Sequence, residues 1–282
     1  MMNRSSPLVS TEWLAEHLSA PDIRVADASW YLPQTGRNAK SEYLSAHIPG
    51  AVFFDIDDLS DEASNLPHML APPAKFASRM RQLGLGDGNL IVVYDGAGIY
   101  SSARAWWMLR AMGHEDVAVL DGGFPKWKRE GRPIQDIVPQ PPSRHFTPRP
   151  NTALLRDFSQ ILQNLETRRE QVVDLRGAGR FAGKEAEPRP GVRPGHIPGS
   201  TNLPYTELSD EAGILKSADA LRDIFAARGI DPGKPIVTSC GSGVTAAIGM
   251  LALIVGGARD VSLYDGSWSE WGARPEVPVA TG

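Results

Sequence analysis

The sequence contains very little cysteine: Cys240 is the only one among 282 residues. A single thiol cannot form a disulfide within the chain or build a multi-cysteine metal site. The histidines also lack the paired spacing of metal ligands, so we expect no metal. A lone cysteine is typical of reducing compartments, and we therefore expect a cytoplasmic protein.

The chain also lacks long apolar segments and an excess of charge of one sign. The longest uncharged apolar run, residues 246–258, is shorter than the roughly 20 residues that cross a bilayer. The N-terminus lacks the continuous apolar core of a signal peptide. Lysine and arginine total 29 against 33 acidic residues, a net charge of −4. We therefore expect no membrane role and no nucleic-acid partner.

The glycine-rich stretch GLGDGN, which begins at Gly84, does not have the context of a dinucleotide-binding loop. It follows an expected helix and precedes an expected strand, whereas a dinucleotide loop connects a strand to a helix. The sequence therefore implies no cofactor.

The chain has enough apolar residues for two cores. Hydrophobic residues make up 41% and charged residues 22% of its 282 positions, as in ordinary globular proteins. A chain of this length exceeds one typical domain, and two domains of roughly 100 to 150 residues are expected.

An internal duplication supports this division. Three landmarks recur in the same order at offsets of 147, 149 and 144 residues: Asp27 as Asp174, His47 as His196, and Trp127 as Trp271. Repetition at a nearly constant spacing is the signature of copied structural units. We therefore predict that each half of the chain is one copy of an ancestral domain.

Short β-branched runs alternate with helix-period segments within each copy. Residues 171–174, 236–239 and 261–264 are predicted strands, and residues 217–228 form a predicted helix. This alternation indicates an α/β fold with a mainly parallel sheet flanked by helices. A proline-rich stretch separates the copies and should be extended. The predicted limits are an N-terminal domain over 1–138, a linker over 139–151 and a C-terminal domain over 152–282.

Cys240 follows directly on a predicted strand, where ligands collect in folds of this kind. Gly241 and Gly243 give the loop CGSGVT the freedom to turn several N–H groups toward one anion. A thiolate there, at the start of a helix that we expect from Thr245, would be favoured by the helix dipole and would be a nucleophile. The alternative is a small buried hydrophobic residue. The first copy has Asp95 at the matching position, a difference that favours one working site and one supporting domain.

Other cysteine chemistries fit less well. A cysteine phosphatase needs an arginine six positions after the nucleophile, and that position is Ala246. A thioredoxin-like site needs a second cysteine, which is missing. A papain-like hydrolase needs a paired histidine, whose position the sequence does not give.

Seven stretches spread over nearly the whole chain carry a family resemblance: ADASWYLP, HIPGAVFFDIDDLSD, LPHML, ARAWWMLR, GRFAGKEAEPRPG, CGSGVTAA and YDGSWSEW. They resemble the tandem-domain sulfurtransferases of the rhodanese superfamily, and in particular those that take sulfur from 3-mercaptopyruvate. The resemblance implies two tandem rhodanese-like domains, with the catalytic cysteine in the second. It also implies that a Cys240 persulfide forms as pyruvate leaves and passes its sulfur to a thiol, such as thioredoxin, or to cyanide.

The same resemblance assigns roles to further residues. Arg180 and Arg189 match the two arginines that grip the donor's carboxylate and keto oxygens, and a guanidinium suits a planar carboxylate. Asp57, His68 and Ser242 match the residues near the thiol, which implies a site between the two halves. The loop residues that the resemblance places around the donor are Gly241, Gly243, Val244 and Thr245.

Two other functions stay open. A thiosulfate:cyanide sulfurtransferase shares this scaffold, but such enzymes typically carry basic residues just after the cysteine, where this chain has Gly241 and Ser242. A non-catalytic rhodanese-like module that binds proteins would not need Cys240.

The repeated HIPG turns and the tryptophans have simpler interpretations. His47 and His196 recur in both copies, so we expect them to maintain the fold rather than to act in catalysis. The tryptophans, such as Trp107 and Trp268, are expected to fill cores.

Overall fold

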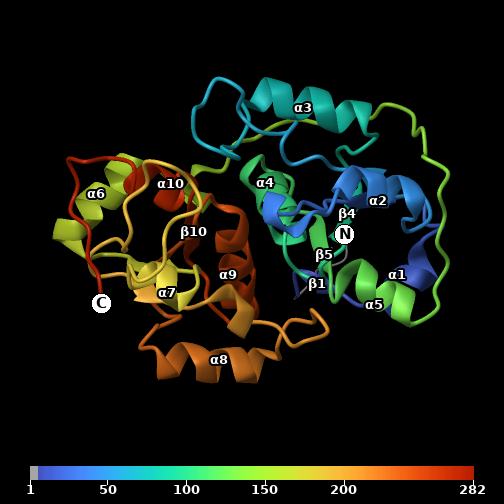
Figure 1. Ribbon diagram of the computed structural model, residues 1–282. Helices are drawn as coiled ribbons and strands as arrows, with labels where there is room; N and C mark the ends of the chain where they lie inside the picture. The colour runs from blue at the N-terminus through green and yellow to red at the C-terminus, as the bar shows by residue number, and fades with distance from the viewer. Residues whose placement is uncertain (1–5) are drawn as a thin grey trace. The chain divides into compact units, whose positions relative to one another are not determined.

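A computed structural model describes residues 6–282 and divides them into two compact units, each with its own sheet (Figure 1). The first unit comprises residues 6–61, 70–151 and 210–215, and the second comprises residues 62–69, 152–209 and 216–282. Each unit therefore includes one short segment from the other half of the sequence.

The first unit contains five strands, five α-helices and one 3-10 turn among its described residues. In chain order they are β1 (Leu8–Val9), α1 (Thr11–His17), β2 (Ile23–Asp27), η1 (Pro33–Thr35), α2 (Ala39–Ser45), β3 (Val52–Phe53), α3 (Pro73–Gln82), β4 (Leu90–Tyr94), α4 (Ser102–Ala111), β5 (Val117–Leu120) and α5 (Gly123–Arg129).

The second unit repeats this plan. Its elements are η2 (Thr152–Leu154), β6 (Leu155–Arg156), α6 (Phe158–Thr167), β7 (Gln171–Asp174), α7 (Ala178–Phe181), β8 (Thr201–Asn202), η3 (Tyr205–Glu207), α8 (Ala218–Ala227), β9 (Ile236–Ser239), α9 (Val244–Val255), β10 (Val261–Tyr264) and α10 (Ser267–Trp271).

Both sheets are parallel and have the same strand order. The first runs β1-β5-β4-β2-β3 and the second β6-β10-β9-β7-β8. The predicted strands over 171–174, 236–239 and 261–264 are confirmed, and so is the helix over 217–228, whose first and last residues cap α8. The predicted parallel α/β fold of both halves is therefore confirmed.

The strands are apolar along their length because helices pack on the sheets and keep them from water. β9 and β10 are buried at every position, and α9 packs against both strands and against α8 (Figure 1). Residues 139–150 contain no helix or strand, as the prolines predict. Among the helices of residues 6–282, none has the length and apolar character needed to cross a bilayer.

The duplicated residues hold the two cores together. Trp127 and Trp271 are fully buried, and each indole donates a hydrogen bond to a proline carbonyl, 2.7 Å to Pro133 and 2.9 Å to Pro278. Trp107 and Trp268 are also buried. These four tryptophans are core residues, as predicted.

The two HIPG histidines are structural as well. His47 stacks on Tyr43 with ring centroids 4.3 Å apart, and His196 stacks on Phe181 at 3.7 Å. Each Nδ1 lies within hydrogen-bonding distance of its stacking partner's carbonyl oxygen, at 2.7 Å and 2.8 Å.

Candidate active site

Cys240 lies between the end of β9 and the start of α9. Gly243, with φ of +80°, has the left-handed conformation that lets the chain turn directly into the helix, which begins at Val244, one residue before the predicted start. The Cys240 N–H donates to Ser267 Oγ at 3.2 Å, and the Cys240 carbonyl accepts the Trp268 N–H at 2.9 Å. The start of α10 thus fixes the backbone on both sides of the thiol.

The matching loop of the first unit holds a buried carboxyl group. Asp95 follows β4 as Cys240 follows β9, and its carbonyl accepts the Phe124 N–H at 2.9 Å, as the Cys240 carbonyl accepts that of Trp268. The Asp95 carboxylate is fully buried and accepts N–H groups of Ala97, Tyr100 and Ser102, each at 2.8 Å. A loop of this kind can therefore direct several main-chain N–H donors toward one acceptor group.

Charged and polar groups surround Cys240, although the residue is only 2% exposed. Burial lowers the pKa of Arg189, negative charge on Cys240 raises it, and the positive charge of Arg180 lowers it again. Burial raises the pKa of Tyr205, and charge on Cys240 raises it further. A thiol packed as a small hydrophobic residue would have apolar neighbours, whereas Cys240 lies close enough to the Arg189 guanidinium and the Tyr205 hydroxyl to interact with both electrostatically.

Arg180 lies against the cysteine loop. A Cβ atom at Gly241 would stand 3.2 Å from a terminal nitrogen of the Arg180 guanidinium, so the absence of a side chain at Gly241 permits this approach. Arg180 is also in an ion pair with Glu187, whose side chain is 3% exposed. The carboxylate holds one edge of the guanidinium in place.

A series of buried ion pairs fixes the position of Arg180. Arg176 donates to Asp174 at 2.6 Å and to Glu187 at 2.8 Å, and Glu187 in turn pairs with Arg180. Arg176 is 2% exposed, and its guanidinium carbon stands 4.4 Å from the Trp268 ring centroid. Buried charges that pair in series are held in fixed geometry, so Arg180 is positioned by its neighbours rather than by solvent.

The structure places the predicted site residues in both units. Ser242 is 8% exposed and follows Gly241 in the loop, and Val244 and Thr245 are the first two residues of α9. His68 has φ of +61° and belongs to segment 62–69, which is part of the second unit. Asp57 belongs to the first unit, where its carboxylate accepts the Trp30 indole N–H at 3.0 Å. The roles of these residues stay predictions.

Three residues near Cys240 and Arg180 were not predicted from the sequence. Arg176 and Glu187 link Asp174 to Arg180, and Tyr205 lies in the field of Cys240. Arg176 could have been noticed, because an arginine directly after a buried strand and two positions past an aspartate is a natural ion-pair partner. Glu187 and Tyr205 lie in irregular segments that carry no such signal.

No group of three or more histidine, cysteine, aspartate or glutamate side chains in residues 6–282 is placed to hold a metal ion. The arrangement around Cys240 can instead hold an anionic substrate beside a nucleophilic sulfur.

Comparison with known proteins identifies the family of this chain. A family model for the rhodanese-like domain matches residues 10–130 and 157–274. Human 3-mercaptopyruvate sulfurtransferase is 45% identical over 283 residues, covering 98% of this chain and 95% of that protein. Bovine thiosulfate sulfurtransferase is 44% identical, covering 98% and 95%.

A solved structure is similar over the same extent. The crystal structure of SseA from Escherichia coli, a 3-mercaptopyruvate sulfotransferase, superposes with a TM-score of 0.86 at 44% identity, covering 94% of this chain and 100% of that one. Because the family model matches both halves and these relatives span nearly the full length, the chain belongs to the rhodanese family as a protein of two tandem rhodanese-like domains.

Proposed function

We propose that this chain is a 3-mercaptopyruvate sulfurtransferase, an enzyme that carries sulfur on Cys240. The observation that supports this most directly is a lone thiol at the start of the twelve-residue helix α9, near Arg189 and next to Gly241, against which Arg180 lies. A thiolate is favoured at a helix N-terminus, and two guanidinium groups suit a substrate with a carboxylate and a neighbouring keto oxygen.

In the first step the Cys240 thiolate attacks the sulfur of 3-mercaptopyruvate. A sulfur–sulfur bond forms, the carbon–sulfur bond breaks, and the electron pair of that bond moves onto the carbon skeleton as the enolate of pyruvate. Protonation of the enolate carbon releases pyruvate. Arg180 and Arg189 bind the donor's oxygens and stabilise the charge that develops on the keto oxygen.

In the second step an acceptor removes the outer sulfur. A thiolate such as that of thioredoxin, or cyanide, attacks the outer sulfur of the persulfide, and the sulfur–sulfur bond breaks to return the Cys240 thiolate. The main-chain N–H groups of Gly241, Gly243, Val244 and Thr245 stabilise the anionic sulfur between the two steps.

In this proposal, Ser242, His68 and Asp57 transfer the protons. Ser242 lies in the cysteine loop, and His68 reaches the second unit through segment 62–69. Asp57 joins the set because it matches the family motif. A cytoplasmic location, inferred from the single cysteine, belongs to the same proposal.

The residues after Cys240 support mercaptopyruvate over thiosulfate as the donor. The two kinds of relative are almost equally similar to this chain, so overall identity does not separate them. Gly241 and Ser242 carry no charge, whereas a doubly charged thiosulfate favours basic residues at these positions. Comparison of kcat/KM for the two donors tests this choice, and a higher value for thiosulfate would reverse it.

Intact-mass spectrometry tests the sulfur carrier. After brief mixing with 3-mercaptopyruvate and removal of small molecules, the wild-type chain should gain the mass of one sulfur atom and yield an equal amount of pyruvate. Cys240→Ser should gain nothing. A mass gain on Cys240→Ser, or pyruvate release by the wild type with no added sulfur, would contradict the mechanism.

A further inference from the structure

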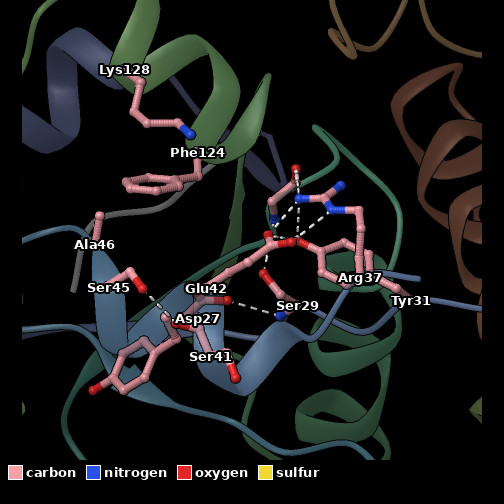
Figure 2. Close-up of a pocket in the computed structure, with 12 residues that line it drawn as sticks. Asp27, Ser29, Tyr31, Arg37, Ser41, Glu42, Ser45, Ala46, Phe124 and Lys128 are labelled. Atoms are coloured by element: carbon pink, nitrogen blue, oxygen red, sulfur yellow. Dashed lines mark hydrogen bonds and ion pairs between the residues drawn. The ribbon is translucent and has the colours of Figure 1, made fainter. Parts of the chain in front are cut away.

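The first unit contains a cavity of about 470 Å³ at the carboxyl ends of its strands (Figure 2). Asp27, Ser29 and Gly96 line it from the ends of β2 and β4, while Phe124 and Lys128 line it from α5. Figure 2 shows Phe124 and Lys128 on one side of the hollow and Asp27 on the other. The mechanism proposed above does not use this cavity.

Hydrogen bonds of backbone N–H groups show that Ser29, which lines the cavity, occupies the same place in the first unit as Arg176 does in the second. The Ser29 N–H donates to Asp27 Oδ1 at 2.9 Å, and the Arg176 N–H donates to Asp174 Oδ1 at 3.0 Å. Ser29 thus stands where the second unit has Arg176. The matching bonds of Phe124 and Trp268 described above place Phe124 where the second unit has Trp268.

In the second unit the Arg176 side chain fills this space. Its guanidinium has three kinds of partner: the carboxylates of Asp174 and Glu187, the Gly195 carbonyl at 2.8 Å, and the Trp268 ring at 4.4 Å. A planar cation with acceptors along its edges and a ring on its face is well satisfied even when it is buried.

The first unit keeps counterparts of three of these partners, Asp174, Gly195 and Trp268, but lacks the cation. Asp27, only 3% exposed, matches Asp174, and Phe124 supplies the aromatic ring. Ala46, which also lines the cavity, precedes His47 as Gly195 precedes His196. Ser29 ends at a short hydroxyl, and the structure from residue 6 onward contains no ion pair between Asp27 and any lysine or arginine.

The other charges around the cavity do not replace the missing guanidinium. Arg37 is held by Glu42, by the Tyr31 hydroxyl at 2.7 Å and by the Gly96 carbonyl at 3.2 Å. The Lys128 ammonium stands 4.7 Å from the Phe124 ring centroid, on the side of the hollow away from Asp27 (Figure 2).

We propose that this cavity binds a small molecule that carries a guanidinium group, with Asp27 as its counter-ion, the Ala46 carbonyl as a further acceptor and the Phe124 ring against its face. A carboxylate at the other end of such a ligand would lie near Lys128. The proposal is independent of the sulfur-transfer reaction, because it rests on the comparison of two homologous positions within one chain.

Methylguanidinium chloride is the probe, titrated into the full chain labelled with ¹⁵N, with potassium chloride at matched ionic strength as the control. Saturable shifts are expected for the amide signals of Ser29, Ala46 and Gly96. The amides around Asp174 should not move, because Arg176 already fills that position. Asp27→Asn should weaken binding at least about tenfold, because a charge-assisted hydrogen bond is lost.

Ser29→Arg provides the matched variant, since it supplies the guanidinium from the chain itself. It should abolish the methylguanidinium shifts and raise the melting temperature. If it does not fold, Phe124→Ala replaces it and should weaken binding by removing the stacking face. Shifts that do not saturate, that potassium chloride reproduces, or that persist unchanged in Asp27→Asn would overturn the proposal.

Discussion

The two units place the same residue type in opposite electrostatic surroundings. Asp174 has the Arg176 guanidinium 2.6 Å away, whereas Asp27 has only neutral hydrogen-bond donors. Burial, the largest influence, raises the pKa of Asp27 to about 6, although hydrogen bonds from Ser29 and Tyr94 act in the other direction. The titratable and charged groups that face it are Tyr43, Tyr94, Asp95, Arg37, Glu42 and Lys128.

Asp27→Asn should therefore stabilise the protein at neutral pH. Wild-type Asp27 holds its proton up to about pH 6 when folded but only to about 3.8 when unfolded, so the folded protein loses stability as the pH rises from about 3.8 to about 6, and the full cost is present above about pH 6. Asparagine does not ionise, so the variant loses no stability in this way. We expect a larger free energy of unfolding for the variant above about pH 6, by at most about 3 kcal/mol, and a difference that disappears near pH 4.

Denaturant unfolding of both proteins between pH 4 and pH 8 measures this difference. Asp136→Asn, which removes a carboxylate from the exposed surface, controls for the change in net charge and should alter stability little at any of these pH values. A loss of stability in Asp27→Asn at pH 8 would show that the carboxylate is favourably paired in the folded protein.

At the scale of elements, the connection between β9 and α9 depends on backbone conformation as much as on the thiol. Gly243 has φ of +80°, a region that costs an L-residue about 1–2 kcal/mol. Its conformation turns the chain from the strand into the helix within a few residues of Cys240. The main-chain donors around the sulfur keep their positions only while this turn is kept.

Gly243→Ala should lower the free energy of unfolding by about 1–2 kcal/mol and slow persulfide formation by up to about a hundredfold. Gly229→Ala is the matched control, because Gly229 has φ of +66° and open space where the added methyl group would stand, but lies between α8 and β9. It should lose similar stability with unchanged rate. Equal rate losses in both variants would indicate that general destabilisation, and not loop geometry, controls the step.

At the scale of the whole molecule, neither unit is built from one half of the sequence. Segment 62–69 of the first half belongs to the second unit, and segment 210–215 of the second half belongs to the first. The second unit therefore depends on residues that lie far from it along the chain, His68 among them.

Replacement of residues 62–69 by a Gly/Ser linker of equal length should weaken the second unit. We expect its free energy of unfolding to fall by about 1–3 kcal/mol, because packed side chains are lost. Hydrogen exchange should then be faster in β7, β9 and β10. The same replacement over residues 136–143, which belong to the first unit and are mostly exposed, should leave these strands protected. Unchanged exchange after the 62–69 replacement would contradict the assignment.

The regular elements were predictable because their patterns are local. The strands over 171–174, 236–239 and 261–264 are apolar runs of strand length, and each has these limits in the structure. The charged residues near Cys240 were harder to predict. Glu187 lies eleven residues from Arg176 in a segment without periodicity, so no spacing indicates that their side chains meet.

The sequence alone determined that the chain holds two copies of a parallel α/β domain and that its one thiol follows a buried strand. Repeats and periodicity depend only on the spacing of residues along the sequence, so they can be recognised without a structure. Only the tertiary structure decided which charges surround Cys240, which unit contains His68, and that Arg176 fills a space left open beside Ser29. These features depend on irregular loops, whose positions are set by packing between residues distant in the sequence.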